Sequence, residues 1–133
     1  MRAPAATVRT LTLLPEDYAV LRFAPGEPVP AWALAAPVPF ASVTRTAAEL
    51  SVICPVPAVP ERLRPAEEWR CLRLEGPFAL DEPGVAASVA VPLAAAGLSV
   101  FVVATYDTDH FLVTDAEAAT AALTAAGHVV VRA

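Results

Sequence analysis

The sequence predicts an α+β fold in which antiparallel sheets carry helices on one face. In the second half of the chain, apolar runs of strand length alternate with alanine-rich stretches of helix length. Two of these stretches end at Gly97 and Gly127, and glycine commonly ends a helix because it tolerates a positive φ. With 133 residues, 56% of them hydrophobic and 17% charged, the chain can bury a core without disulfides or metals.

The second half of the chain yields a clear order of elements. Residues 69–74 read WRCLRL, an alternation that predicts a strand, and residues 84–96 are small and apolar, which predicts a helix. Residues 99–105 form the continuous β-branched and aromatic run SVFVVAT, which predicts a strand buried on both faces. A tight turn at 106–109 then leads to a short strand over 110–113.

A capping pattern opens the second helix. Thr114 and Glu117 have the spacing of a capping box, so Thr114 is predicted to cap a helix that ends at Gly127. Residues 129–132 supply a last strand. The order over 69–132 is therefore β-α-β-β-α-β, the ferredoxin-like arrangement of two helices on one face of an antiparallel sheet.

The first half is less regular and is predicted to be a truncated second copy of that unit. Its strand pair over 42–54 mirrors the later pair over 100–113, because each is a β-rich run broken by a short polar turn. We therefore expect an N-terminal truncated unit over 1–66 and a complete C-terminal unit over 67–133. The elements expected in the first half are strands at 11–14, 18–23, 40–46 and 49–54 and short helices at 30–34 and 60–68.

Charge and hydropathy argue against several function classes. A net charge of −5 with nine basic residues leaves no positive face for a phosphate backbone, so we expect no nucleic-acid partner. The first ten residues lack the apolar stretch of a signal peptide, and no apolar run reaches the length of about 18 residues that a membrane span needs. We therefore expect a cytoplasmic protein without a membrane partner.

Catalytic and metal chemistry find little support in the sequence. Cys54 and Cys71 are 17 residues apart, with no second cysteine beside either, so we expect buried free thiols rather than zinc ligands or a redox pair. Asp109 and His110 are adjacent, so on a strand their side chains point to opposite faces. No serine stands in the glycine elbow of a hydrolase. We expect no enzyme activity, no metal and no cofactor.

Polar groups of both signs are predicted at one edge of the second unit. In a β-α-β-β-α-β unit, the end of the first strand, the start of the first helix and the hairpin of the middle strands share one edge. The loop over 79–84 should therefore face the turn over 105–109. The unpaired N–H groups at the helix start suit a carboxylate, and Glu82, Asp107 and Asp109 suit an ammonium group. This combination predicts a site for a free α-amino acid.

Each of these residues also has a structural interpretation. Asp107 and Thr108 are ordinary turn formers, because their side chains bond nearby backbone groups. Glu82 could serve only the helix dipole, and Asp109 could occupy a strand end that is open to water. The residue pattern leaves both interpretations open.

Three segments together resemble a known family. They are SVTRTAAELSVICP at 42–55, GVAASVAVPLAAAGLSVFVVATYDTDHFLV at 84–113 and GHVV at 127–130. In order and spacing they resemble the ACT-like proteins related to the CASTOR arginine sensors, the ACT_7 family. The resemblance implies tandem ACT-like units with an amino-acid site between them. It also implies a homodimer, because the sensors carry two tandems and this chain carries one.

The resemblance also implies which residues meet the ligand. It places an aspartate at Asp109, a glutamate at Glu82 and strand backbone near residues 42–43 against the amino acid, with Thr105 and Tyr106 lining the site. Together with the edge argument, the predicted ligand-binding residues are Ser42, Val43, Glu82, Pro83, Gly84, Val85, Thr105, Tyr106, Asp107, Thr108 and Asp109.

A ligand-free module is the alternative function. An ACT-like domain whose exposed sheet edge pairs with a partner protein or with its own copy needs no small molecule. The sequence does not fix which amino acid would bind, because alanine, valine and leucine would line the pocket, and it does not name a downstream partner.

Overall fold

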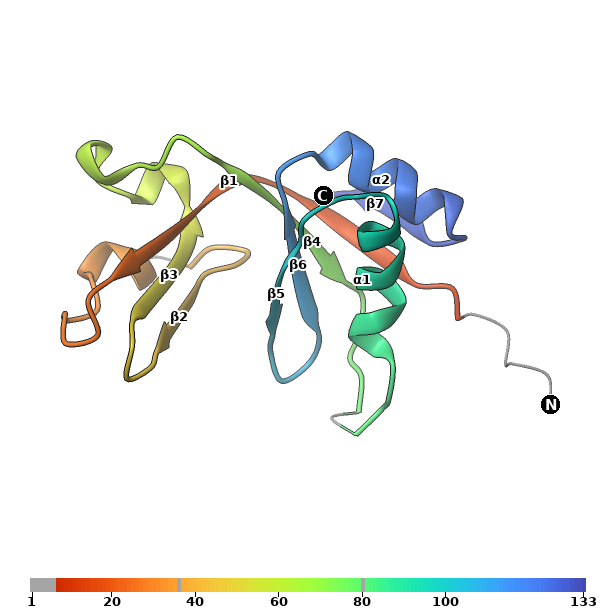
Figure 1. The fold of residues 1–133 in the computed structure, drawn as a ribbon, viewed down its shortest axis with the longest axis horizontal. Coiled ribbons are helices and arrows are strands. Elements are labelled where there is room, and N and C mark those ends of the chain that lie inside the picture. Colours follow the sequence, from red (N-terminus) through yellow and green to blue (C-terminus); the bar gives the residue numbers. More distant parts are fainter. Residues whose placement is uncertain (1–6, 36, 80) are drawn as a thin grey trace. The chain divides into compact units, whose positions relative to one another are not determined.

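The computed structural model describes residues 7–35, 37–79 and 81–133 (Figure 1). The predictions that involve residues 1–6 and Leu80 of the loop before the first helix lie outside the described residues. The chain forms two compact units. The first, which we call the helical unit, contains the residues up to Pro15 together with Cys71–Ala133, and the second, the proline-rich unit, is Glu16–Arg70. The predicted division lay between residues 66 and 67, whereas in the structure the segment that ends at Pro15 belongs to the same unit as Cys71–Ala133.

The helical unit contains the predicted order of elements (Figure 1). An α+β arrangement is therefore confirmed for this part of the chain. Its elements are β4 (Trp69–Leu74), α1 (Val85–Ala95), β5 (Phe101–Ala104), β6 (Asp109–Val113), α2 (Ala116–Ala125) and β7 (Val129–Arg132).

The sheet of the helical unit contains one strand that the prediction did not place there. β7 pairs in parallel with the first residues of β1 (Thr10–Phe23), from Thr10 opposite Val129 to Leu13 opposite Arg132. β1 in turn neighbours β4, so it lies between the first and last strands of the predicted β-α-β-β-α-β unit. β4 then neighbours β6, which pairs antiparallel with β5.

The core of the helical unit follows from two periodicities. Alternate strand residues face the helices, and helix residues four positions apart face the sheet. Burying each leucine or phenylalanine fully contributes about 1.5–3 kcal/mol before the entropy of ordering is counted. The buried residues are Leu11 and Leu13 on β1, Leu72 and Leu74 on β4, Phe111 and Val113 on β6, Val89 and Leu93 on α1, and Ala119 and Leu123 on α2.

Two local predictions for this unit were wrong. β5 is not buried on both faces, because it ends the strand order, and Phe101 and Val102 are 39% and 41% exposed. The cap of α2 is Asp115 rather than Thr114, since the Asp115 side chain accepts a hydrogen bond from the N–H of Ala118 at 3.0 Å. Both side chains are good caps, and the helix begins one residue later than the capping-box pattern indicated.

The proline-rich unit is a small antiparallel sheet in the order β2-β3-β1. β2 (Ser42–Arg45) pairs with β3 (Leu50–Pro55), which pairs with the second part of β1 from Tyr18 opposite Pro55 to Phe23 opposite Leu50. The two strands predicted at 11–14 and 18–23 are thus one strand of 14 residues that contributes to both units.

The helices predicted in the proline-rich unit are only short 3-10 helices. They are η1 (Ala31–Leu34), η2 (Val56–Ala58) and η3 (Glu61–Leu63). Prolines at 55, 57, 60 and 65 remove the N–H donors that a longer helix would need. The core of this unit is smaller, with Ala19, Ala33, Leu50, Val52, Cys54 and Val59 buried. Cys54 and Cys71 are both buried free thiols, as predicted.

Candidate functional site

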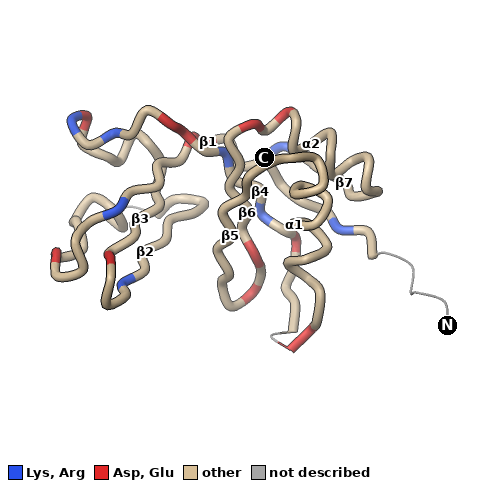
Figure 2. The backbone as a smooth tube through the Cα atoms, in the orientation of Figure 1, with Lys and Arg blue, Asp and Glu red and all other residues tan. Residues whose placement is uncertain are grey.

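A cavity of about 360 Å³ lies in the helical unit, between the loop before α1 and the β5–β6 hairpin. Figure 2 marks positions of acidic residues in red along the backbone of both segments. Eight of the eleven predicted ligand-binding residues line this one cavity: Glu82, Gly84, Val85, Thr105, Tyr106, Asp107, Thr108 and Asp109. The topological argument therefore brought together residues from two segments that are 20 positions apart in the chain.

The other three predicted residues lie elsewhere. Pro83 lines a neighbouring cavity of about 470 Å³ in the same unit. Ser42 and Val43 lie on β2 in the proline-rich unit, and they are not among the described residues that line the 360 Å³ cavity. Their predicted contact with a ligand stays a prediction.

The start of α1 supplies hydrogen-bond donors to the cavity. Gly84 is the N-terminal cap residue with a φ of 77°, a conformation that glycine adopts without a steric penalty. Within the described residues, no side chain caps this helix, and its first turn contains no acidic residue. The N–H groups of the first turn, where Val85, Ala86 and Ala87 line the cavity, have no partner within the helix. Together with the helix dipole they favour a negative group.

The hairpin turn uses its threonines to hold its own shape. The backbone N–H and the hydroxyl of Thr105 both donate to the carbonyl of Thr108 at 2.8 Å. The hydroxyl of Thr108 donates to the carbonyl of Leu74 at 2.6 Å. This supports the structural interpretation of Thr108. The carboxylates of Asp107 and Asp109 are then the main polar side chains that the hairpin presents to the cavity.

The two walls of the cavity are fastened to each other. The N–H of Phe78 donates to the carbonyl of Asp107 at 2.9 Å. Gly76 packs so closely on the same carbonyl that a Cβ there would lie 2.9 Å from its oxygen, too close for any side chain. The loop before α1 and the hairpin are therefore held at a fixed separation at this end.

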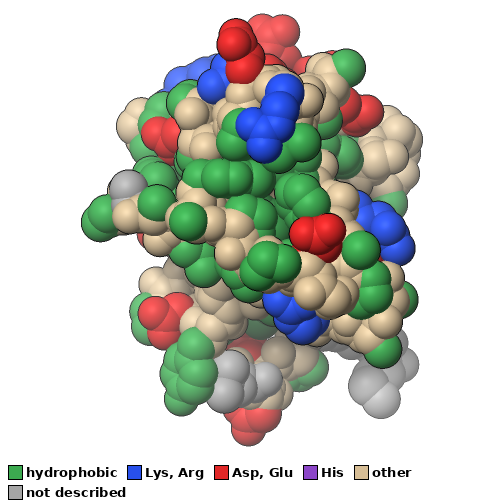
Figure 3. All heavy atoms as spheres, turned by 90° about the vertical axis from the view of Figure 1, so that its left-hand side faces the viewer, with side chains coloured by type: hydrophobic (Ala, Val, Ile, Leu, Met, Phe, Trp, Pro, Cys, Tyr) green, Lys and Arg blue, Asp and Glu red, His purple; other side chains and the backbone are tan. Residues whose placement is uncertain are grey.

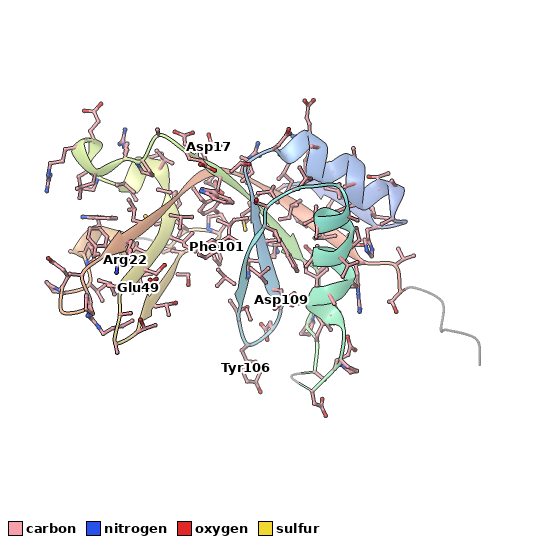
Figure 4. The ribbon with its side chains drawn as sticks, viewed as in Figure 1. Asp17, Arg22, Glu49, Phe101, Tyr106 and Asp109 are labelled. Atoms are coloured by element: carbon pink, nitrogen blue, oxygen red, sulfur yellow. The ribbon has the colours of Figure 1, made fainter. Side chains whose placement is uncertain are left out.

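The cavity is acidic on its hairpin side. Asp109 begins β6 opposite Ala104, and Figure 4 shows it on the side of α1, whereas Tyr106 at the hairpin tip points outward and is 78% exposed. Partial burial raises the pKa of the Asp109 carboxyl above its ordinary value, because the charged form loses hydration. His110, the next residue, is buried and does not line the cavity, as expected for neighbours on a strand.

Several residues of this region were missed by the sequence analysis. Phe78, Ala86 and Ala104 line the cavity, and their small or apolar side chains carry no chemical signal of their own. Arg9 was also missed, although its Nη1 atom lies 3.7 Å from Oε2 of Glu82, because 73 positions separate the two residues. Among the described residues, no cluster of three or more potential metal ligands occurs, and no helix is long and apolar enough to cross a membrane.

Two family models match parts of the chain. The model of the ACT domain family ACT_7 matches residues 65–125, which include both walls of the cavity, and a model for an N-terminal domain matches residues 16–62. The fold and the site thus define an ACT domain, which supports a ligand-binding regulatory role. Residues 65–125 of this chain belong to the ACT_7 family of ACT domains.

Relatives of known sequence or structure share these features to different extents. The chain is 38% identical to protein Atu0741 from Agobacterium tumefaciens, with 96% of each chain covered and a TM-score of 0.84. It is 46% identical, over 48 residues, to the human protein named cytosolic arginine sensor for mTORC1 subunit 1. That match spans 35% of this chain and 15% of the human protein.

A more distant structure shares the fold alone. The regulatory subunit of aspartate kinase from Thermus flavus is 16% identical, with a TM-score of 0.57 and 93% of this chain and 99% of that chain covered.

Proposed function

We propose that this chain is a regulatory module that binds a free α-amino acid in the 360 Å³ cavity, and that it is not an enzyme. The observation that carries the proposal is the pairing of opposite polar groups across one small cavity. The uncapped start of α1 lies on one wall, and the carboxylates of Asp107 and Asp109 lie on the other. A zwitterion is the ligand that uses both.

The binding mode follows from this pairing. The ligand carboxylate accepts hydrogen bonds from the first-turn N–H groups of α1, where the dipole favours it. The ligand ammonium group binds the carboxylate of Asp109. The positive ammonium group stabilises the charged form of the partly buried Asp109 carboxylate. Ligand binding therefore lowers the pKa of Asp109, which burial has raised. Apolar lining from Phe78, Val85 and Ala104 contacts the ligand side chain.

The size of the cavity suits a small metabolite. Sites for small molecules occupy about 300–1,000 Å³, and this cavity lies at the lower end of that range. Arginine is the first amino acid to test, because the curated relatives are named arginine sensors and because the cavity carries carboxylates.

We extend the proposal to the whole chain. The two units correspond to tandem ACT-like units, with the proline-rich unit reduced to three strands and short 3-10 helices. The protein acts in the cytoplasm as a homodimer, and it signals by presenting a different surface to a partner in its bound state.

A thermal-shift panel of the twenty amino acids at millimolar concentration tests the proposal. A ligand at 100 times its dissociation constant adds about 2.7 kcal/mol to the free energy of unfolding. We expect one amino acid or a small group to raise the melting temperature. Asp109→Ala should abolish the rise, whereas Glu117→Gln, which removes a carboxylate from the first turn of α2, should retain it.

The second candidate function is a ligand-free interaction module. The observation that favours it is the edge position of β5, where Phe101 and Val102 are substantially exposed. An edge strand of this kind can accept another strand. If all twenty amino acids leave the melting temperature unchanged, the amino-acid proposal fails and this function takes its place.

A further inference from the structure

We propose that Arg9 is a positioning residue for the cavity: from the segment before β1 it fastens the cavity wall that runs from Phe78 to the first turns of α1. The inference rests on the proposed function, because it concerns the same cavity. The inference adds a residue to the site, Arg9, which is not among the described residues that line the cavity.

The side chain of Arg9 contacts three parts of this wall. Its Nε atom donates to the hydroxyl of Ser88, which lies in α1, at 3.1 Å. Its Nη1 atom lies 3.7 Å from Oε2 of Glu82, and its guanidinium stacks over the Phe78 ring at 5.3 Å from the ring centre. One side chain thus connects both ends of the segment with the helix that follows.

The backbone of Arg9 is itself held at two points. Its N–H donates to Nδ1 of His128 at 2.9 Å, and its carbonyl accepts from the N–H of Val129 at 2.9 Å. Arg9 therefore cannot move toward or away from the wall without breaking its contact with the start of β7. This anchoring gives a flexible arginine side chain a fixed base.

The same histidine also supports α1. Because Nδ1 of His128 accepts a hydrogen bond, the ring carries its proton on Nε2, and that atom donates to the carbonyl of Ser88 at 2.8 Å. In a regular helix this carbonyl would bind the N–H of residue 92, but Pro92 has none. His128 therefore replaces the missing helical bond and joins α1 to the backbone of Arg9.

The neighbouring 470 Å³ cavity is lined by the same residues that support the wall. Arg9, Ser88 and His128 line it, and their polar atoms bond to one another rather than facing an empty space. We therefore assign these residues a supporting role and do not propose a second ligand site there.

The strength of the contact depends on all three parts. The Arg9 side chain is 12% exposed, whereas Glu82 is 43% exposed, so water screens their ion pair and the pair alone holds the wall only weakly. The stacking on Phe78 and the hydrogen bond to Ser88 are more protected from water. Removing Glu82's charge should therefore loosen the wall less than removing Arg9.

Amide hydrogen exchange on the ligand-free full chain tests the positioning role directly. Arg9→Met should speed exchange about tenfold at the hydrogen-bonded amides of Phe78, Glu82 and Ser88, while Glu82→Gln speeds it less than about threefold. The matched control is Arg22→Met, because Arg22 forms an ion pair of the same 3.7 Å length with Glu49 in the proline-rich unit (Figure 4). It should leave these amides unchanged.

Two further measurements separate positioning from general stability. Arg9→Lys keeps the positive charge and replaces Arg9→Met if that variant does not fold. Its exchange rate should lie between those of the wild type and Arg9→Met, because lysine lacks the planar guanidinium of arginine. Exchange in β4 and β6 should stay unchanged. Equal acceleration in those strands, or no acceleration at 78–88, would overturn the inference.

Binding completes the test, with the amino acid that most raises the melting temperature of the wild type as the probe. Arg9→Met should weaken its binding about tenfold, and Arg22→Met should not. Faster amide exchange within 78–88 with an unchanged affinity for the amino acid would overturn the positioning role. If no amino acid binds the wild type, the proposed function fails, whereas the exchange rates still show whether Arg9 fastens the wall.

Discussion

The two units of this chain differ in what proline allows their sequences to form. Nine of the fourteen prolines lie in Glu16–Arg70, where the structure contains three strands and short 3-10 helices. The helical unit keeps long stretches free of proline and forms two helices, one of which starts at the acidic cavity. A helix start is thus available for ligand binding only where the sequence can continue a helix.

The two units also differ in the chemistry of their cavities. A hollow in the proline-rich unit has a volume of about 160 Å³ and is lined by apolar residues such as Trp32, Val38 and Pro55. Hydrophobic side chains also appear on the surface of that side of the molecule in Figure 3. The cavity of the helical unit instead combines carboxylates with helix N–H groups. These features place the proposed binding of a small polar ligand in the helical unit.

The largest expected effect comes from truncating the core of either unit. Leu93→Ala on α1 and Leu50→Ala on β3 each remove a fully buried side chain, and each should cost about 2–5 kcal/mol. Because β1 pairs with strands of both units, we expect both units to unfold in one transition.

Two spectroscopic probes report the units separately in this test. Far-UV circular dichroism follows α1 and α2 in the helical unit, whereas the fluorescence of Trp32, measured with Trp69→Phe in every variant, follows the proline-rich unit. Coincident urea transitions that shift together in both variants agree with the account. A shift of the circular-dichroism transition alone in Leu93→Ala would show that the units unfold independently.

A smaller effect is expected at the cap of α2, a regular feature of the helical unit that the 3-10 helices of the other unit lack. Asp115→Ala should lower the free energy of unfolding by about 1 kcal/mol, because it removes the acceptor for the N–H of Ala118. Thr114→Ala should change it by less than about 0.5 kcal/mol. Chemical denaturation of both variants measures the difference, and the reverse ranking would restore Thr114 as the cap.

The smallest effect is expected from Asp109→Asn, and it has a characteristic pH dependence. Burial raises the folded-state pKa of Asp109, so its charged form opposes folding at neutral pH. The substitution should therefore stabilise the ligand-free protein at pH 7 by about 0.5 kcal/mol, or roughly 2 °C in melting temperature.

The pH range of this effect follows from the direction of the pKa shift. Above the raised folded pKa the destabilisation by Asp109 is fully present, and it disappears as the pH falls through that value toward the unfolded value of about 3.9. Thermal melts of both proteins across this range measure it. A variant less stable than the wild type at pH 7 would mean that the structure stabilises the carboxylate.

Local patterns predicted most of the helical unit. Alternation predicted β4, the short run over 129–132 was predicted as the last strand, β7, and the two glycine-ended stretches predicted α1 and α2. The pattern could not show that β1 lies between β7 and β4, because that pairing joins residues about 120 positions apart. It also could not show that β5 is an edge strand, since a continuous apolar run looks the same at the edge and in the centre of a sheet.

The candidate site was predicted to a similar degree. Topology alone placed the loop before α1 opposite the hairpin, and eight predicted residues line the cavity there. Arg9 could not be predicted, because its partners Ser88 and His128 are 79 and 119 positions away and a single arginine before a strand has no distinctive pattern.

The central claim is that an amino acid binds between α1 and the β5–β6 hairpin, and an NMR titration tests it most directly. The ¹⁵N-labelled full chain would be titrated with each of the twenty amino acids, starting with L-arginine. We predict that amide shifts concentrate at residues 78–87 and 104–109, with little change on β3. Shifts confined to the proline-rich unit, or no shifts with any of the twenty, would contradict the account.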